Sequence, residues 1–366
     1  MAEKYYPFKP HSHRITTADG VFSKAEVTLA NRNSGILLEM LTEDITPTGV
    51  HYLLNHFDVP IIRETTHKLE FSGEFESPYA LCMEEIRSLP AVSLPVTLEC
   101  AGNGRAGVSP RSHSMPWHYE AVGTSIWTGT PLLPLIERAR PAQCVVEFSF
   151  TGADFGYDKG CGHYFARSLT LEQLQHLDVL LVHSMNGSAL LPQHGAPLRI
   201  IVPGWYGMAS VKWLVDIKAL VKPFDGFQQV RTYRYRQSVD DPGQPIQGMR
   251  VKSLMVPPGV PDWSTRCRHL QPGITTLTGR AWSGLGNAIT AVDIEIDGTW
   301  YQASLSERHS KYAWTQWSFD WDATPGEYFL RCRATDALGD TQPMDPPWDV
   351  AGFSNNAAQT VHVYVD

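Results

Sequence analysis

The sequence predicts an α+β domain followed by a β-sandwich, and three observations support this fold class. From about residue 45 to 235, short β-like runs alternate with helical segments and with loops rich in glycine and proline. A cluster of turn-forming residues follows at 240–245. Beyond this cluster, short stretches that alternate between polar and apolar residues dominate the chain. The expected domains therefore cover residues 1–238 and 239–366.

Four segments of the first domain have patterns typical of a single element. Residues 145–150 and 198–202 are rich in β-branched and aromatic side chains, which predicts strands. Residues 131–138 and 171–177 have the spacing and starting residues of short helices. The mixture predicts an α+β domain with long loops.

In the second domain, apolar residues recur at every second position in three stretches: Val292, Ile294 and Ile296; Tyr328, Leu330 and Cys332; and Val361, Val363 and Val365. This period is typical of strands that bury one face, so the stretches predict a sandwich. The domain is also rich in tryptophan, beyond what its core is expected to need. These tryptophans are Trp282, Trp300, Trp314, Trp317, Trp321 and Trp348. Because the strands also supply exposed edges, we expect the sandwich to mediate a two-fold dimer.

Composition limits the classes of partner. The formal net charge of -8 argues against a nucleic-acid partner, and a phosphate-bearing ligand would need a local cluster of basic side chains. We expect no membrane partner, because no long apolar stretch is present. The six cysteines are scattered without metal-finger spacing, and the first residues lack a leader pattern. Both features predict a cytoplasmic protein with reduced thiols.

Cys100 ends an apolar, strand-like run and opens a glycine-rich turn that continues to Arg105. A thiolate is a good ligand for a soft metal, and Arg105 would add a fixed charge beside it. Residues 102–107 also fit the spacing G-x-G-x-x-G, which is typical of dinucleotide-binding loops. That motif needs a helix to begin there, and the prolines at 110 and 116 argue against one. A serine hydrolase is disfavoured as well, because no G-x-S-x-G is present.

Together with the stretches 194–199 and 202–214, this turn resembles the molybdenum domain of the sulfite oxidase family, over roughly residues 40–366. The resemblance implies molybdenum and a molybdopterin, with Cys100 as the metal ligand. It assigns the rest of the cofactor-binding set to Asn55, His56, Asp154, His194, Arg199, Ser210, Val211 and Lys212. It also implies that the sandwich is an immunoglobulin-like dimerisation domain.

The resemblance further implies a substrate pocket near the metal. Arg105 matches an arginine that attracts an oxyanion, Tyr233 matches a tyrosine beside the reactive oxygen, and Trp117 matches a pocket wall. Members that oxidise sulfite have an arginine directly before Asn55, whereas this chain has Leu54. One lost charged hydrogen bond costs a buried anion about 1.5–3 kcal/mol, so sulfite is expected to be a poor substrate. Good sulfite turnover would require another cation to complete the pocket, with Arg231, Arg234 and His113 as the candidates.

The expected function is a two-electron oxygen-atom transfer on a small substrate. The alternatives within this class are a true sulfite oxidase or dehydrogenase and a reductase of S-oxides or N-oxides. The sequence has no motif for c-type haem, cytochrome b5 or an iron–sulfur cluster, so the electrons are expected to pass to a separate carrier. A cofactor-free binding protein on the same scaffold is the alternative from another class, and the presence of Cys100 with the whole pterin set argues against it.

Overall fold

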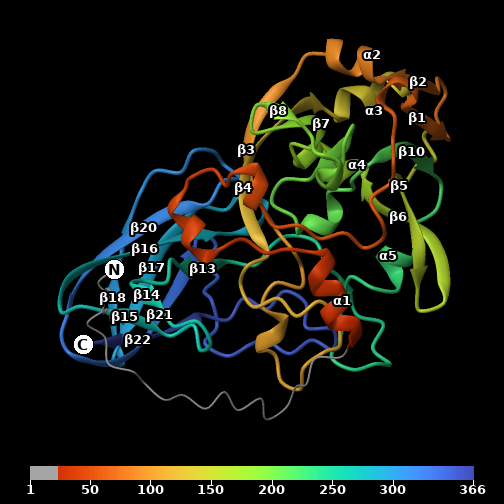
Figure 1. Ribbon diagram of the computed structural model, residues 1–366. Coiled ribbons are helices and arrows are strands. Elements are labelled where there is room, and N and C mark those ends of the chain that lie inside the picture. The colour runs from red at the N-terminus through yellow and green to blue at the C-terminus, as the bar shows by residue number, and fades with distance from the viewer. Residues whose placement is uncertain (1–23) are drawn as a thin grey trace, which may run out of the picture.

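Two β-rich units follow one another along the chain in a computed structural model that describes residues 24–366 (Figure 1). Residues 1–23 of the expected first domain lie outside the described residues. They include the first residues of the chain, from which the cytoplasmic location was predicted. Figure 1 shows the first unit (orange to green) beside the sandwich (blue). No helix within 24–366 combines the length and the apolar character that a membrane crossing requires.

Two five-stranded sheets form the first unit. One sheet has the order β2 (Tyr79–Cys82), β1 (Lys68–Gly73), β10 (Leu214–Leu220), β5 (Glu147–Asp158) and β6 (Cys161–Thr170). The other has β3 (Val92–Glu99), β4 (Val122–Pro131), β7 (Leu180–Met185) and β8 (Ser188–Ala189), with β9 (Arg199–Ile201) paired to β7. The two strands predicted at 145–150 and 198–202 occur as β5 and β9.

The helices of this unit are short and lie around the sheets: α1 (Lys24–Arg32), α2 (Met83–Ser88), α3 (Leu133–Ala139), α4 (Leu171–His176) and α5 (Phe227–Val230). The predictions of helix at 131–138 and 171–177 are confirmed by α3 and α4. At the start of α4, the Thr170 hydroxyl accepts a hydrogen bond from the Gln173 amide, and the Gln173 side chain accepts one from the Thr170 amide. This capping box satisfies two amides that the first helical turn leaves without partners.

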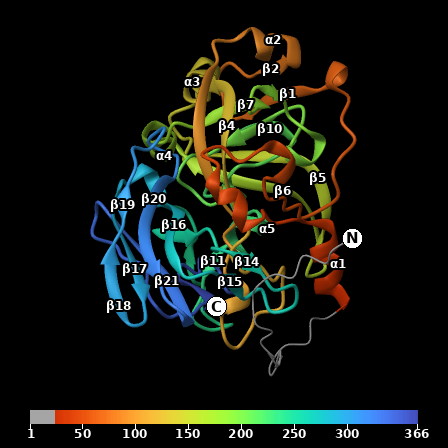
Figure 2. The same cartoon turned by 60° about the vertical axis from the view of Figure 1, so that its left-hand side comes forward.

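A small hairpin of β11 (Arg234–Tyr235) and β12 (Gln244–Pro245) leads into the sandwich. One sandwich sheet has the order β13 (Lys252–Met255), β16 (Gly273–Trp282), β20 (Thr315–Ala323) and β19 (Ser304–Leu305). The other has β14 (Val260–Pro261), β15 (Arg268–Leu270), β22 (Gln359–Val365), β21 (Gly326–Asp336), β17 (Ile289–Ile296) and β18 (Thr299–Gln302). Figure 2 shows these two sheets stacked below the first unit.

The alternation predicted for β17 is confirmed. Val292, Ile294 and Ile296 are buried in the sandwich core. The acidic residues between them lie on the other face, where Glu295 pairs with Arg331 at 2.9 Å and Asp293 pairs with Arg333 at 3.4 Å. One face of the sheet is therefore apolar, and the other is stabilised by cross-strand charge pairs.

The interpretation of the tryptophans as a surplus beyond the core is wrong. Four of the six are buried, namely Trp282, Trp314, Trp317 and Trp321. Trp282 and Trp314 pack into the core of the first unit, so they join the two units of one chain. Their indole N–H groups donate hydrogen bonds to Glu99 and to the Asp44 carbonyl, which explains how such large polar-tipped side chains are buried.

Candidate active site

Cys100 directly follows β3, whose last four residues are buried. The Cys100 amide donates a hydrogen bond to the Ala121 carbonyl at 2.9 Å, and the Gly102 amide donates one to Cys100 Sγ at 3.4 Å. Gly104 has a φ of +92°, which favours glycine, and the chain then makes a single 3-10 turn over Arg105–Gly107. Because no helix begins there, the dinucleotide-binding alternative is excluded.

Burial raises the pKa of the Cys100 thiol, and the Gly102 amide and the charge of Arg105 oppose this effect in part. A thiol must lose its proton to bind a metal, so binding at Cys100 would release a proton. Within the described residues, no group of three or more His, Cys, Asp or Glu side chains could hold a metal ion. A metal here would have Cys100 as its protein ligand and would need its other ligands from a cofactor.

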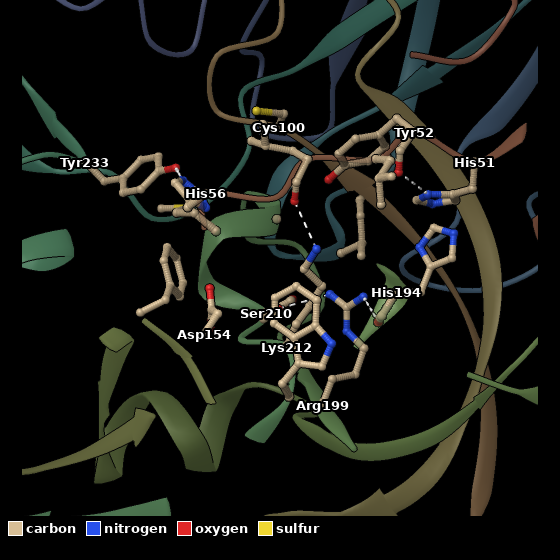
Figure 3. Close-up of a pocket in the computed structure, with 17 residues that line it drawn as sticks. His51, Tyr52, His56, Cys100, Asp154, His194, Arg199, Ser210, Lys212 and Tyr233 are labelled. Carbon is tan, nitrogen blue, oxygen red and sulfur yellow. Dashed lines mark hydrogen bonds between the residues drawn. The ribbon is translucent and has the colours of Figure 1, made fainter. Parts of the chain in front are cut away.

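Basic side chains gather beneath Cys100 in a pocket that 17 residues line, which we call the inner pocket (Figure 3). Lys212 Nζ donates to the carbonyls of Leu54 and Gln193, both at 3.0 Å, and to the Asn55 side chain. Arg199 donates to the carbonyls of His194 at 2.8 Å and Ser210 at 3.0 Å. Burial lowers the pKa of Arg199 to about 10 and holds that of Lys212 well below its usual range.

This pocket lacks anions to match its cations. No ion pair among residues 24–366 includes Lys212 or Arg199, and Arg199 Nε is buried with no hydrogen-bond partner. The one acidic group in the lining is Asp154, and burial raises its pKa to about 6. One buried and one half-buried cation, Arg199 and Lys212, are satisfied mostly by carbonyl groups, and they form a site that fits an anionic group such as a phosphate.

Two amides of the segment 210–212, which belongs to the expected cofactor-binding set, are already engaged. The Ser210 amide donates to Gly207 and the Val211 amide to Ala209, both at 3.1 Å. The Ser210 hydroxyl accepts a hydrogen bond from the Val202 amide at 3.0 Å, which leaves its own hydrogen as a donor. The side-chain donors that this segment offers an anion are the Ser210 hydroxyl and Lys212 Nζ.

Two histidines line one side of the pocket (Figure 3). His51 and His194 pack edge to face at 5.7 Å, and burial lowers their pKa values to about 4 and about 3. His51 Nε2 is buried without a partner. Neutral imidazoles can donate and accept hydrogen bonds, which suits the mixed edges of a pterin. Sequence reasoning missed His51 and its neighbour Tyr52, although both immediately precede the Leu53–Asn55 segment that it did identify.

Tyr233 and His56 form a hydrogen-bonded pair between Tyr233 Oη and His56 Nε2. Burial raises the pKa of Tyr233 and lowers the pKa of His56 to about 3, so the phenol donates and the neutral imidazole accepts. The His56 ring also packs against Phe165 at 4.6 Å. His56, which was expected at the pterin, is therefore also a direct partner of the expected substrate residue.

A second cavity of about 280 Å³ also has Cys100 in its lining, and we call it the outer cavity. Both spaces are lined by Cys100, Leu54, His56 and Tyr233. The outer cavity also includes Arg105 and Trp117, and the indole N–H of Trp117 is buried without a partner. The structure thus brings together all the residues expected to form the substrate pocket.

Arg105 is buried and tightly held. Its Nε donates to the Ala351 carbonyl at 2.6 Å, Nη1 donates to the Met115 carbonyl at 3.1 Å, and the guanidinium lies 4.9 Å from the centroid of the Phe353 ring. Ala351 and Phe353 belong to the second domain, so both domains build this wall. Sequence reasoning missed this contribution because nothing local in residues 351–353 points to Cys100.

None of the three candidates for a further pocket cation lines either cavity, so that hypothesis is wrong. Arg234 donates to the carbonyls of Pro242 and Gly243, and the His113 side chain is 65% exposed beside Glu26. The buried cation near Tyr233 is Arg167 of β6, whose guanidinium lies 5.6 Å from the Tyr233 ring centroid. Arg167 donates to the Gln228 carbonyl, its Nε has no partner, and burial lowers its pKa to about 10.

Comparisons with known proteins agree with this geometry. Residues 56–228 match the oxidoreductase molybdopterin-binding domain family, and residues 244–366 match the molybdenum-cofactor oxidoreductase dimerisation domain family. Human mitochondrial sulfite oxidase is 32% identical over 355 residues, which cover 89% of this chain. The NADH nitrate reductase of Lotus japonicus is 30% identical over 348 residues, which cover 85% of this chain.

The chain spans 63% of the length of the human protein and 38% of that of the Lotus protein. Among solved structures, the sulfane dehydrogenase SoxCD from Paracoccus pantotrophus superposes with a TM-score of 0.77 and 23% identity, over 99% of this chain and 97% of that one. This likeness confirms the fold, and the molybdopterin-binding domain implies a molybdenum cofactor. The chain belongs to the sulfite oxidase family of molybdopterin oxidoreductases.

Proposed function

We propose that this protein transfers an oxygen atom to or from a small substrate of low charge at a molybdenum centre bound to Cys100. The observation that carries this proposal is that Cys100 lines two adjoining spaces that differ in their charged side chains. The inner pocket holds cations without matching anions. The outer cavity has one guanidinium in its lining, and that group already donates to two carbonyls.

Cys100 would bind the metal, and Lys212, Arg199 and Ser210 would hold the phosphate of the pterin. His194, His51 and Asp154 would meet the pterin edges, with Asp154 able to donate once it is protonated. When bound, the cofactor supplies the two-electron redox step and the reactive oxygen. These roles match the family resemblance, and the charges and hydrogen-bond donors of the pocket support them.

The outer cavity favours a substrate with little negative charge. Leu54, Trp117 and Tyr233 offer apolar surface there, and Arg105 is the one cation in the lining. A doubly charged oxyanion would lose its hydration without gaining enough charged hydrogen bonds. An uncharged S-oxide or N-oxide, or its reduced form, meets fewer penalties. The oxygen of such an oxide can replace His56 Nε2 as the acceptor of the Tyr233 hydroxyl, which has a single hydrogen to donate.

Tyr233 and His56 can hold or transfer a proton beside the substrate. The Tyr233 phenol keeps its proton because burial raises its pKa, while His56 Nε2 accepts the hydrogen bond. If a substrate oxygen takes the hydroxyl proton, the charges of Arg105 and Arg167 would stabilise the phenolate. Arg167 thus acts behind Tyr233 rather than on the substrate.

A true sulfite oxidase is the second candidate function. The 32% identity with human mitochondrial sulfite oxidase supports it, as does the positive field of Arg167 behind the cavity. Nitrate is a further substrate to test because of the nitrate reductase relative. Electrons would pass to or from a separate carrier protein.

We also propose a homodimer through the sandwich and a cytoplasmic location. The match to a dimerisation domain supports the first, and the sandwich exposes 89% of Trp263 and 72% of Ile274. The absence of disulfides supports the second, because all six cysteines are free. Light scattering at micromolar concentration and fractionation of the native host would test these two proposals.

A substrate panel tests the proposed function. Protein from a host that makes the cofactor is first assayed for molybdenum and for pterin fluorescence, and the expected content is about one of each per chain. Sulfite, nitrate, a dialkyl sulfoxide and an aromatic N-oxide are then compared, with an artificial electron acceptor for oxidation and a reduced viologen for reduction. We expect the uncharged compounds to have the higher kcat/KM. Efficient sulfite turnover would establish the second candidate, and fully folded protein without molybdenum would contradict both.

A further inference from the structure

A groove of about 430 Å³ lies along the β15–β22 side of the sandwich and shares no lining residue with the inner pocket or the outer cavity. Its lining includes Cys267, Arg268, His118, Tyr119 and His362. A cysteine and a histidine that line the same groove are the elements of a nucleophilic pair.

The strand register brings three reactive side chains into one row. β15 and β22 are parallel with Arg268 opposite Val363, so Cys267 lies beside His362 one position earlier on both strands. β21 and β22 are antiparallel with Glu327 opposite Tyr364. His362 and Tyr364 project to the same face because side chains alternate along a strand. Cys267, His362 and Glu327 therefore form a row across three neighbouring strands, with Cys267 directly before β15, His362 in β22 and Glu327 in β21.

Hydrogen bonds connect this row in the order that a nucleophile requires. Cys267 Sγ lies 3.1 Å from His362 Nδ1, and His362 Nε2 lies 2.8 Å from Glu327 Oε1. A carboxylate can only accept, so Nε2 carries the hydrogen and Nδ1 is left with a lone pair facing the thiol. The Tyr364 hydroxyl donates to the same Glu327 oxygen at 3.1 Å.

The imidazole is also fixed by ring packing. It stacks on Phe329 with centroids 4.4 Å apart and contacts Tyr364 at 4.6 Å on a tilted plane. A ring held by two aromatic neighbours and a carboxylate keeps Nδ1 directed at the sulfur. The thiol lies at one ring nitrogen of His362 and the carboxylate at the other. This arrangement of nucleophile, base and orienting carboxylate is the one that activates thiols.

We infer that Cys267 is a nucleophilic thiol that reacts with small disulfides entering this groove. As Cys267 Sγ attacks one sulfur of the disulfide, its proton passes to His362 Nδ1. A bond between Cys267 and that sulfur forms while the original S–S bond breaks. The released thiolate takes the proton back from His362, so the products are a mixed disulfide at Cys267 and a free small thiol. Glu327 stabilises the imidazolium that exists between these steps.

The chain contains its own reference thiol. Cys144 is exposed in the first domain, whereas Cys267 is 6% exposed. If exposure alone set the rate of reaction with a disulfide, Cys144 would react faster than Cys267. If His362 activates Cys267 as proposed, Cys267 reacts faster than Cys144.

The experiment treats the molybdenum-loaded protein with 2-hydroxyethyl disulfide and follows each cysteine by peptide mass spectrometry over time. We expect Cys267 to react at least about tenfold faster than Cys144. His362→Asn keeps a polar side chain but removes the base, so it should lower the Cys267 rate by at least about tenfold and leave the Cys144 rate unchanged. Glu327→Gln, at an exposed position, should cause a smaller loss at Cys267.

Two results would overturn the inference. One is a native Cys267 that reacts no faster than Cys144, and the other is a His362→Asn rate at Cys267 equal to that of the native protein. The unchanged Cys144 rate and an unchanged thermal midpoint show that a variant is folded. If His362→Asn does not fold, equal Cys267 rates in Glu327→Gln and the native protein decide against the inference.

Discussion

Glu99 and Lys252 form a buried ion pair at 2.8 Å that joins the two domains directly beside Cys100. Glu99 also accepts hydrogen bonds from Asn103 Nδ2 and from Trp282 Nε1, both at 3.0 Å. Lys252 also donates to the Asn355 carbonyl at 2.9 Å. The residue before the proposed metal ligand is thus fixed by a charge from the other domain.

Breaking this pair should destabilise the protein strongly. Lys252→Met leaves the Glu99 carboxylate buried without its counter-ion, which costs about 3–5 kcal/mol in the free energy of unfolding. Glu99→Gln/Lys252→Met should recover part of that loss, because no lone charge remains buried. Urea unfolding of the single and double variants measures the coupling. Equal losses in Lys252→Met and in the exposed control Lys218→Met would contradict the assignment.

Cys100→Ser should abolish turnover and leave the fold intact. An alkoxide is a harder and more basic ligand than a thiolate, so the metal would lose its protein bond. Molybdenum content, activity and the thermal midpoint are measured together. Cys332→Ser is the matched control, since Cys332 is also buried but lies in the sandwich core. Retention of most of the activity in Cys100→Ser would show that Cys100 is not the ligand.

Leu54→Arg should lower the KM for sulfite by about tenfold, which corresponds to one added charged hydrogen bond. Leu54 lines the outer cavity with Arg105, and a second guanidinium there would share the charge of an oxyanion. Leu53→Arg is a useful control, because Leu53 lines the inner pocket but not the outer cavity. Molybdenum content must stay constant across the set. A native enzyme that already has a micromolar KM for sulfite and a high kcat would refute the reasoning from Leu54.

The cofactor-free protein should lose stability in mild acid. Burial lowers the pKa of His51 to about 4 and that of His194 to about 3, below their unfolded values near 6.5. The unfolded chain therefore binds protons first as the pH falls below 6.5, and stability present above 6.5 is lost toward pH 4. Each histidine should account for about 2–3 kcal/mol between pH 6.5 and 4.5.

His194→Gln should make that pH dependence shallower, as measured by urea unfolding at a series of pH values. The exposed His118 is the control, and His118→Gln should keep the native slope. Asp154 acts in the opposite sense, because its raised pKa of about 6 lowers stability as the pH rises from 4 to 6. A slope unchanged by His194→Gln would mean that His194 stays accessible to protons in the folded chain.

Local sequence patterns predicted the elements that depend on their own residues. The alternation in β17 and the capping residues of α4 specify a strand and a helix wherever they occur. The two-domain order followed from the change in pattern near residue 240. The burial of the tryptophans was not predicted, because Trp282 and Trp314 are buried against the other unit of the chain. The pattern within one domain does not show which of its side chains another domain will cover.

The site was predictable only in part for a related reason. Cys100, Arg199 and Lys212 occur in stretches that resemble the family, so their positions could be named, although their roles stay predictions. Arg167 lies in an ordinary strand, and only the fold brings it to Tyr233. The contact between His56 and Tyr233 joins residues 177 positions apart, and no local pattern encodes it.

The anchoring of the Cys100 turn also bears on how the protein matures. The Ser354 amide donates to the Ala101 carbonyl at 2.6 Å, and the Asn355 side chain donates to the Gly104 carbonyl at 2.7 Å. During synthesis, a chain that has not yet reached this segment lacks these two partners and holds the turn only through first-domain contacts such as that of Cys100 with Ala121. The turn therefore gains its last anchors only when the end of the sandwich has been made and has docked.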